Sequence, residues 1–403
     1  MQSDDNDAYP VDLQLQPDGK LVVTGPQRSE NTYIDFALVR YTATGALDPT
    51  FGKGGKVVTP VGSGASSDRA AALQVQRDGK LVVAGTTNNS FKPTGDDFAV
   101  VRYTAAGVLD PRFGTGGKVI TPVGAGSSDD TATALQVQPD GKLIVAGYTI
   151  KSDSTGYDFA VVRYTTGGAL DTSFGKGGKV VTPVGVGGSN DVANAVQVQP
   201  DGKIVLAGLA GRDVALVRYT AAGALDTGFG KGGKVVTPIG PGDSRDVAFA
   251  LQVQPDGKLV VAGSTDGGTT GDDFALLRYT ATGTLDPTFG KGGKVITPVG
   301  LGASSDQAAA LRVQPDGKLV AAGTASQDTG TPGFYFSLVR YRADGTLDTS
   351  FGRGGKVVTP VAGGARVDAL RALQVQRDGK LVVAGYVNGG TSGSDFALVR
   401  YWP

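Results

Sequence analysis

The sequence predicts an all-β protein made of repeated antiparallel sheets, and three observations support this. The tripeptide Asp-Gly-Lys recurs at intervals of 60, 62, 61, 55, 60 and 62 residues, beginning at Asp18, Asp78, Asp140, Asp201, Asp256, Asp316 and Asp378. The 64 glycines and 20 prolines among the 403 residues are typical of short strands joined by tight turns. Apolar residues alternate in short runs, and no long stretch has helical spacing. The period near 60 therefore outweighs the two or three domains that length alone would suggest.

The first two strands of each unit form a hairpin. In the unit spanning residues 65–126, we expect a first strand at 72–76 and a second at 80–85. Asp78-Gly79 lies between them, and Asp-Gly between runs rich in Val and Leu is a strong hairpin signal, because glycine readily adopts positive φ.

Two further strands complete the unit. A loop of variable length leads to a third strand at 97–103, and a longer connection leads to a fourth at 118–122. Phe98 and Val100 alternate with Ala99 and Val101, so both faces of the third strand are apolar and both must be covered. Seven four-stranded sheets that cover one another in this way form a seven-bladed β-propeller.

The count of strands is uneven. The first three strands occur seven times, but the fourth, marked by Val-Val-Thr-Pro or Val-Ile-Thr-Pro, occurs six times. We therefore expect a single propeller domain over 1–403 whose last blade has three strands, or a fragment of a longer parent. The predicted blades are approximately 1–64, 65–126, 127–187, 188–242, 243–302, 303–364 and 365–403.

The repeated sequence motifs resemble those of a known family. Asp-Gly-Lys-Leu-Val-Val-Ala-Gly, then Asp-Phe-Ala-Leu-Val-Arg-Tyr, then Leu-Asp-x-x-Phe-Gly-x-Gly-Gly-Lys-Val is similar to the delta-60 repeat of bacterial, especially deltaproteobacterial, proteins. The resemblance covers nearly the whole chain and implies the strand order of NHL-type propellers, with the first strand innermost. It then implies that the fourth-to-first and second-to-third loops share one face, here called the top. The family's function is largely uncharacterised.

Composition excludes much chemistry. Cysteine and histidine are absent, which rules out disulfides, thiolate nucleophiles and every Ser-His-Asp arrangement. Glu30 is the one glutamate, so a general acid or base must be Asp, Lys or Tyr. A net charge of +0 gives no reason to expect nucleic-acid binding. No apolar run is long enough for a membrane span, and the first residues lack the pattern of a signal peptide.

One carboxylate recurs ten residues before the turn aspartate, and we expect it at the mouth of the central channel. It can cap backbone N–H groups where the chain enters the first strand. Alternatively, a ring of carboxylates can bind a polar ligand or a Ca²⁺ ion, the one cofactor considered. These candidate binding residues are Asp68, Asp130, Asp191, Asp246, Asp306 and Asp368.

Two other slots in the repeat carry charge. An aspartate precedes the third strand in six units, and we expect it to be a turn residue. These aspartates are Asp35, Asp97, Asp158, Asp213, Asp273 and Asp395, and the sixth unit has Tyr335 instead. An arginine lies within the third strand at Arg40, Arg102, Arg163, Arg218, Arg278, Arg340 and Arg400. Its apolar flanks predict that it bridges neighbouring blades through carboxylates or carbonyls.

The second-to-third loops vary most between units. They carry the aromatic residues Tyr33, Phe91, Tyr157, Phe334 and Tyr335, our second set of candidate binding residues. Divergent loops on a rigid scaffold commonly form binding sites, although such polar tracts can also be tolerated insertions.

Three functions fit these observations. The first is a non-enzymatic binding scaffold, monomeric and extracytoplasmic, that recognises a protein or glycan through the top-face loops, with edge pairing at the open seventh blade as a further contact. The second is a hydrolase or lyase that uses the channel-mouth aspartates and a bound cation. The third is a recently amplified or engineered repeat with no evolved ligand. Because catalysis needs unlike groups in one pocket and the repeat offers near-identical ones, we favour the first function.

Overall fold

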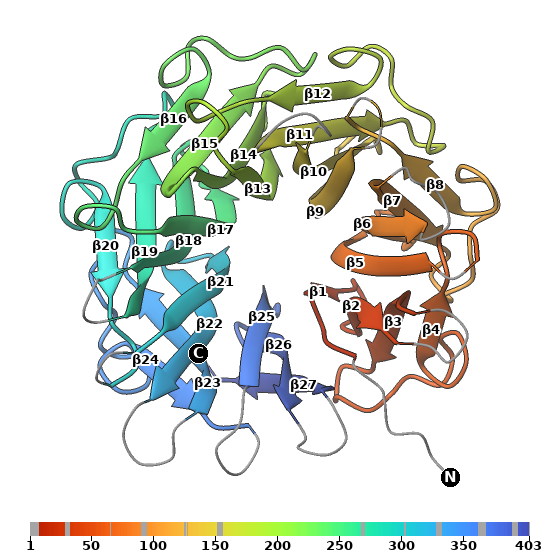
Figure 1. Ribbon diagram of the computed structural model, residues 1–403. Coiled ribbons are helices and arrows are strands. Elements are labelled where there is room, and N and C mark those ends of the chain that lie inside the picture. Colours follow the sequence, from red (N-terminus) through yellow and green to blue (C-terminus); the bar gives the residue numbers. More distant parts are fainter. Residues whose placement is uncertain are drawn as a thin grey trace. The chain divides into compact units, whose positions relative to one another are not determined.

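The computed structural model describes residues 8–28, 33–64, 66–89, 95–124, 126, 128–150, 156–266, 271–301, 304–327, 333–361, 368–388 and 394–402. These residues form an all-β seven-bladed propeller, with six blades of four antiparallel strands and a last blade of three (Figure 1). They contain no helix, and therefore none that could cross a membrane. The predicted fold class and the three-stranded last blade are confirmed.

Each blade is continuous in sequence. The strands of blades 1 to 3 are β1 (Asp12–Leu15), β2 (Leu21–Gln27), β3 (Asp35–Tyr41), β4 (Lys56–Thr59), β5 (Ser66–Val75), β6 (Leu81–Asn89), β7 (Asp96–Tyr103), β8 (Lys118–Thr121), β9 (Asp129–Val137), β10 (Leu143–Ile150), β11 (Tyr157–Tyr164) and β12 (Lys179–Thr182). Blades 4 and 5 contain β13 (Asp191–Val198), β14 (Ile204–Ala210), β15 (Asp213–Tyr219), β16 (Lys234–Thr237), β17 (Asp246–Val253), β18 (Leu259–Asp266), β19 (Asp272–Tyr279) and β20 (Lys294–Thr297). Blades 6 and 7 contain β21 (Asp306–Val313), β22 (Leu319–Gln327), β23 (Gly333–Tyr341), β24 (Lys356–Thr359), β25 (Asp368–Val375), β26 (Leu381–Asn388) and β27 (Ser394–Tyr401).

The chain packs as two compact units. The first unit is Met1–Val198 with Ala221–Ala224, and the second is Gln199–Thr220 with Leu225–Pro403. In the first unit, Val82 and Val100 of blade 2 join one apolar cluster with Val145 and Val162 of blade 3. In the second unit, blade 5 packs against blade 6 and blade 6 against blade 7 in the same way. These blades therefore bury apolar area against their neighbours, which is what holds single four-stranded sheets together.

The third strand of a blade is covered on both faces, as its composition predicts. In β7, Phe98, Ala99, Val100 and Val101 are all at 0% exposure, although successive side chains point to opposite faces of the sheet. A sheet of an open sandwich would leave one of these faces in water.

The hairpin turn also forms as predicted. In blade 2, the Gln76 N–H donates to the Lys80 carbonyl at 2.8 Å, and the Gly79 N–H donates to the Gln76 carbonyl at 2.9 Å. Gly79 has a φ of 80°, a conformation that costs glycine nothing and strains other residues.

The strands of this hairpin are longer than predicted. β5 begins at Ser66, six residues before the predicted start at 72, and β6 continues to Asn89 instead of ending at 85. A β-bulge between Ala70 and Ala72 explains the difference, because the extra residue interrupts the apolar alternation while pairing continues from Ala70 to Ser66.

A buried arginine links one blade to the next. Arg40 in β3 is 5% exposed, and its Nε donates to Oδ2 of Asp48 at 2.8 Å. Its Nη1 donates to the carbonyl oxygen of Ala105, in the third-to-fourth connection of blade 2, at 2.5 Å. The guanidinium also lies 4.6 Å from the centroid of the Phe51 ring, within the range of a cation–π interaction.

The same link recurs in blades 2 to 5, so the prediction that this arginine bridges blades is confirmed for five of its seven positions. In each case Nη1 donates to a carbonyl of the next blade, namely Arg102 to Thr166, Arg163 to Ala221, Arg218 to Ala281 and Arg278 to Ala343. A backbone bond accompanies it, since the Gly114 N–H donates to the Gly167 carbonyl at 2.9 Å. Gly114 has a φ of 52°, and a Cβ there would lie 2.3 Å from the Lys118 carbonyl oxygen. Only glycine fits this position.

We predict that Arg163→Lys lowers the free energy of unfolding by about 2 kcal/mol, because an ammonium cannot reproduce the planar guanidinium contacts with Asp171 and the next blade. Urea unfolding would measure the change. Arg342→Lys, at an exposed position, is the matched control and should alter stability by less than about 0.5 kcal/mol. Equal losses in the two variants would contradict the role assigned to Arg163.

Candidate functional site

The six aspartates predicted at the channel mouth are buried. We call them the inner aspartates: Asp68, Asp130, Asp191, Asp246, Asp306 and Asp368. Their exposed fractions are 0 or 1%, so none presents its carboxylate to solvent. Each lies in or at the start of a first strand, directly after the loop that leads in from the fourth strand of the preceding blade.

Each inner aspartate accepts hydrogen bonds from that incoming loop. Oδ2 of Asp68 accepts from the Val61 N–H at 2.6 Å and from the Ser66 hydroxyl at 3.0 Å. The Thr87 hydroxyl, from the second strand of the same blade, donates to Oδ1 at 2.5 Å. A backbone N–H seven residues upstream makes the corresponding bond to Asp130, Asp191, Asp246, Asp306 and Asp368. This geometry fits the capping alternative for these carboxylates.

The same donor set disfavours a calcium ion at these residues. N–H and O–H groups direct hydrogens at the carboxylate oxygens that a cation would need. Within the described residues, no three or more His, Cys, Asp or Glu side chains come close enough to hold a metal ion. The predicted Ca²⁺ and the predicted ligand-binding role of the inner aspartates both remain predictions.

Blade 6 lacks this threonine hydroxyl. Thr149 and Thr265 donate to Asp130 and Asp246 as Thr87 does to Asp68, but blade 6 has Ala325 at this position. Among the described residues, no hydroxyl therefore reaches Oδ1 of Asp306, and this buried oxygen has no hydrogen-bond partner there. Burial raises the pKa of Asp306 above its ordinary value.

The structure also brings the second set of aspartates toward the inner ones. Burial and then the negative charge of Asp246 raise the pKa of Asp213. In the next pair of blades, burial and then the charges of Asp306 and Asp272 raise the pKa of Asp273. The prediction that these aspartates are turn residues is wrong, because Asp213 and Asp273 are paired residues of β15 and β19. Each lies near the inner aspartate of the following blade, a proximity that the linear sequence did not reveal.

The aromatic loop residues differ in exposure. Tyr33 is 62% exposed and Phe334 is 36% exposed, whereas Tyr335 and Tyr157 are half-buried. Tyr157 packs edge-on against Tyr148 of the neighbouring strand, with ring centroids 4.9 Å apart. Phe91 lies outside the described residues. The loop prediction is wrong for Tyr157, the first residue of β11, and for Phe334 and Tyr335, which lie in β23, because these strands begin earlier than the apolar alternation indicated. Tyr33, just before β3, and Phe334 are the aromatics of this set that are exposed enough to contact a ligand.

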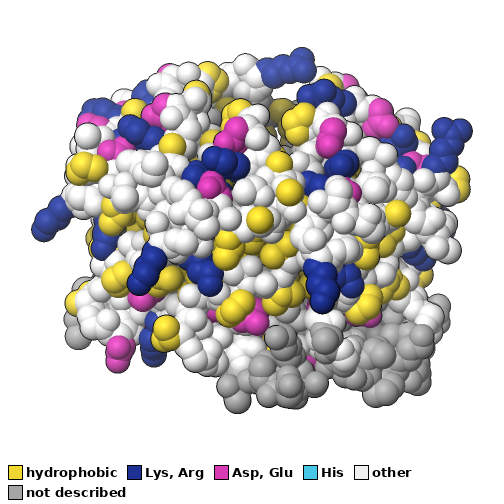
Figure 2. Space-filling view, turned by 90° about the horizontal axis from the view of Figure 1, so that it is seen from above, with side chains coloured by type: hydrophobic (Ala, Val, Ile, Leu, Met, Phe, Trp, Pro, Cys, Tyr) yellow, Lys and Arg dark blue, Asp and Glu magenta, His cyan; other side chains and the backbone are white. Residues whose placement is uncertain are grey.

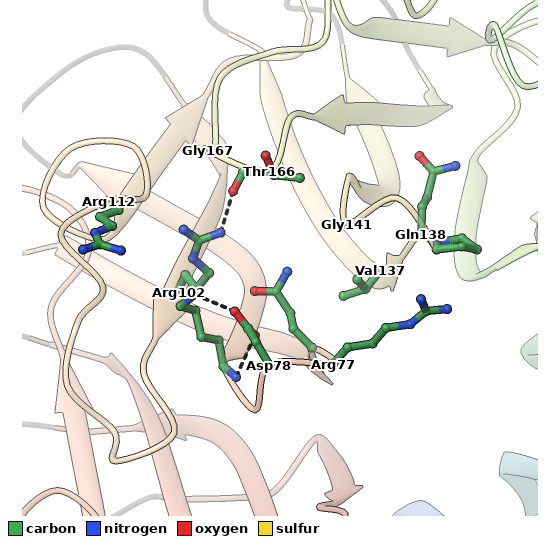
Figure 3. A pocket seen from close by; sticks show the side chains of 12 residues that line it. Arg77, Asp78, Arg102, Arg112, Val137, Gln138, Gly141, Thr166 and Gly167 are labelled. Carbon is green, nitrogen blue, oxygen red and sulfur yellow. Dashed lines mark hydrogen bonds and ion pairs between the residues drawn. The ribbon is translucent and has the colours of Figure 1, made fainter.

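A pocket that the sequence analysis missed lies in the first unit, between blades 2 and 3 (Figure 3). We call it the blade 2–3 pocket, and its volume is about 470 Å³. Its walls are the hairpin turns at 76–80 and 138–141 and the third-to-fourth connections that carry Arg112 and Thr166. Four cationic side chains line it, from Arg77, Lys80, Arg102 and Arg112, with one carboxylate, from Asp78.

A signal for this pocket was present in the sequence. Arg77 stands where five other units have proline, and Arg112 stands where the others have Thr, Ser or Gly. Neither departure alone points to a site, and only the fold shows that the two arginines border one pocket.

Comparison with known proteins identifies the repeat. A family model described as "Domain of unknown function (DUF5122) beta-propeller" matches residues 16–51, 76–113, 138–174, 199–229, 254–289, 314–351 and 376–403, more than half of the chain. This match supports the predicted tandem propeller repeat, while the resemblance to the delta-60 repeat remains a prediction. No curated protein matches the chain.

Solved structures with a similar fold are distant in sequence. They include a protein of unknown function from Dyadobacter fermentans (13% identity, TM-score 0.46, covering 83% of this chain and 94% of that one). An α-L-arabinanase from Penicillium chrysogenum has 16% identity and a TM-score of 0.45, covering 82% and 92%. A polysaccharide lyase, an ulvan lyase, has 12% identity and a TM-score of 0.49, covering 96% and 90%. At these identities the similarity concerns the fold alone.

We predict that Ala325→Thr stabilises the protein by about 1–2 kcal/mol, because its hydroxyl would supply the hydrogen bond that Oδ1 of Asp306 lacks. Thr87→Ala is the mirror variant and should lower stability by a similar amount. Urea unfolding would test both. If neither variant changes stability, the hydroxyl-to-carboxylate bond is not what stabilises this position.

We predict a pH dependence at Asp306 that opposes the one at Asp171. Because the pKa of Asp306 is raised, its contribution to stability is fully present below the unfolded pKa, about 4, and is lost as pH rises through the folded pKa. As pH rises from about 4 to 7, the free energy of unfolding of Asp306→Asn should therefore increase relative to that of the wild type.

Asp171→Asn provides the opposite sign. Hydrogen bonds from Lys142 and Ser173 hold the pKa of Asp171 well below its usual range, so its contribution is present above about pH 4 and lost on further acidification. As pH rises from about 2 to 4, the free energy of unfolding of the wild type should accordingly increase relative to that of Asp171→Asn. Thermal unfolding of the wild type and both variants between about pH 2 and 7 would measure both trends, and parallel trends would refute the assignment.

Proposed function

The chain belongs to the DUF5122 β-propeller family, and we propose that it is a non-enzymatic binding scaffold. Its ligand is a protein or glycan, recognised through the side chains of the second-to-third loops. We also propose that the protein is extracytoplasmic.

The observation that carries the proposal is that the repeat's charged groups interact with one another. The inner aspartates accept bonds from their own loops, and the third-strand arginines are paired with aspartates such as Asp48 and Asp110. Asp48 also forms an ion pair with Lys20, whose Nζ lies 3.1 Å from Oδ2. Groups committed to internal hydrogen bonds in this way are poorly placed to act as a general acid or base.

The surface agrees with this internal pairing. On the face shown in Figure 2, Lys and Arg side chains are interspersed with Asp side chains, and hydrophobic groups lie between them. Recognition therefore depends on side chains that the repeat does not use. Tyr33 and Phe334 are such side chains, and exposed aromatic rings offer a large apolar contact area to protein and sugar surfaces.

We predict that Tyr33→Ala/Phe334→Ala weakens ligand capture at least about tenfold, because each ring supplies contact area worth more than about 1 kcal/mol. Binding to a glycan array and to an array of immobilised surface proteins would be measured for the wild type and the variant. Val108→Ala is the matched control, since Val108 is also 62% exposed but lies in a third-to-fourth connection.

The outcomes separate the candidate functions. Loss of a bound ligand in the double variant, with retention in Val108→Ala, supports loop recognition. Cleavage of an arrayed glycan that disappears in Asp246→Asn would instead favour the hydrolase or lyase alternative. Identical profiles for the wild type and the double variant would refute recognition through these aromatics.

A further inference from the structure

The blade 2–3 pocket carries an unbalanced positive charge. Among the described residues that line it, Asp78 is the one carboxylate, and it is paired with Lys80, whose Nζ lies 2.5 Å from Oδ2. Arg102 donates from Nε to Oδ2 of Asp110 at 2.9 Å and from Nη1 to the Thr166 carbonyl. Among the described residues, the guanidinium groups of Arg77 and Arg112 have no such partner, and they leave the pocket with two uncompensated positive charges.

Most other units of the repeat have no arginine at these two positions, so the blade fold does not require one there. At the position of Arg77, five other blades have proline, at Pro17, Pro139, Pro200, Pro255 and Pro315. At the position of Arg112, blades 1 and 5 have Thr50 and Thr288, whose hydroxyls bond the aspartate two residues earlier at 2.7 Å. Arg112 thus replaces a stabilising hydroxyl with an exposed cation, a change that its own blade does not require.

The arrangement of the arginines suits an anion. Figure 3 shows Arg112 and Arg77 on opposite sides of the pocket, with Arg102 between them. A guanidinium presents paired N–H donors that match the two oxygens of a carboxylate, sulfate or phosphate. The volume is sufficient for a small organic ligand, and the absence of aromatic side chains from its described wall leaves charge as the main source of recognition.

We propose that the blade 2–3 pocket binds a small ligand with carboxylate, sulfate or phosphate groups, held between Arg77 and Arg112. Gln76 and Gln138 add side-chain amides that can donate to the same ligand. This site is formed by hairpin turns and third-to-fourth connections, so it is separate from the loop aromatics of the proposed function, and either can fail without the other.

The chain itself supplies the test variants. Arg77→Pro/Arg112→Thr restores residues that stand at these positions in other blades, so the folded backbone accepts them. Arg342→Thr/Arg377→Pro is the matched control, because it also removes two exposed arginines in favour of residues used in other units, but outside the pocket. The two variants have the same net charge, which cancels the general effect of charge on anion binding.

Isothermal titration calorimetry at low ionic strength would measure the binding of citrate, inorganic sulfate and inorganic phosphate to all three proteins. We expect the wild type and the control to bind at least one of these anions with equal affinity, and the pocket variant to bind it at least about tenfold more weakly. Tighter binding of citrate identifies the ligand group as a carboxylate, and tighter binding of sulfate or phosphate identifies it as a tetrahedral oxyanion.

Two results would overturn the proposal: no binding of any of the three anions to the wild type, or equal binding to the pocket variant. A thermal midpoint for the pocket variant at or above that of the wild type would show that lost binding is not lost folding. We expect this midpoint because the threonine introduced in place of Arg112 would regain the hydroxyl bond seen at Thr50.

Discussion

The structure depends on a buried arginine that connects three things at once: an aspartate of its own blade, the ring of a phenylalanine, and a backbone carbonyl of the next blade. A four-stranded sheet with two apolar faces cannot remain alone in water, and side-chain packing by itself does not determine how far one sheet slides on another. The directional bonds of Arg40 and its equivalents define that position. They also explain why Leu-Asp-x-x-Phe-Gly follows each third strand of the first six blades, since the aspartate and the phenylalanine are both partners of the guanidinium.

This internal pairing limits what the repeat can do for a ligand. The carboxylates and cations that recur from blade to blade satisfy one another or the backbone, and the residues left for recognition are those in which the blades differ. This class contains Tyr33, just before β3, and Phe334, near the start of β23. It also contains Arg77 and Arg112 around the blade 2–3 pocket. A scaffold of near-identical blades can thus acquire specificity by local substitution, because the framework that holds each blade does not involve the substituted positions.

Sequence reasoning identified some features of the site and missed others for physical reasons. The bridging role of Arg40 was predictable because a charged group flanked by apolar residues must be buried and therefore paired. The inner aspartates were found by their spacing, but spacing could not distinguish a capped carboxylate from one open to a ligand; the bonds from Val61, Ser66 and Thr87 make that distinction. The early start of β5 was missed because a bulge at Ala70 breaks the alternation on which strand prediction relies.

By itself the sequence determined the seven repeats, the order of strands within a blade and the three-stranded last blade, because these depend on hairpin turns and alternation over a few neighbouring residues. Only the tertiary structure decided which groups from different blades meet. Asp273 approaches Asp306, and Arg112 borders the same pocket as Gln138, through contacts between segments distant in the chain. Such contacts depend on how one sheet packs on the next, and no local pattern of residues encodes that geometry.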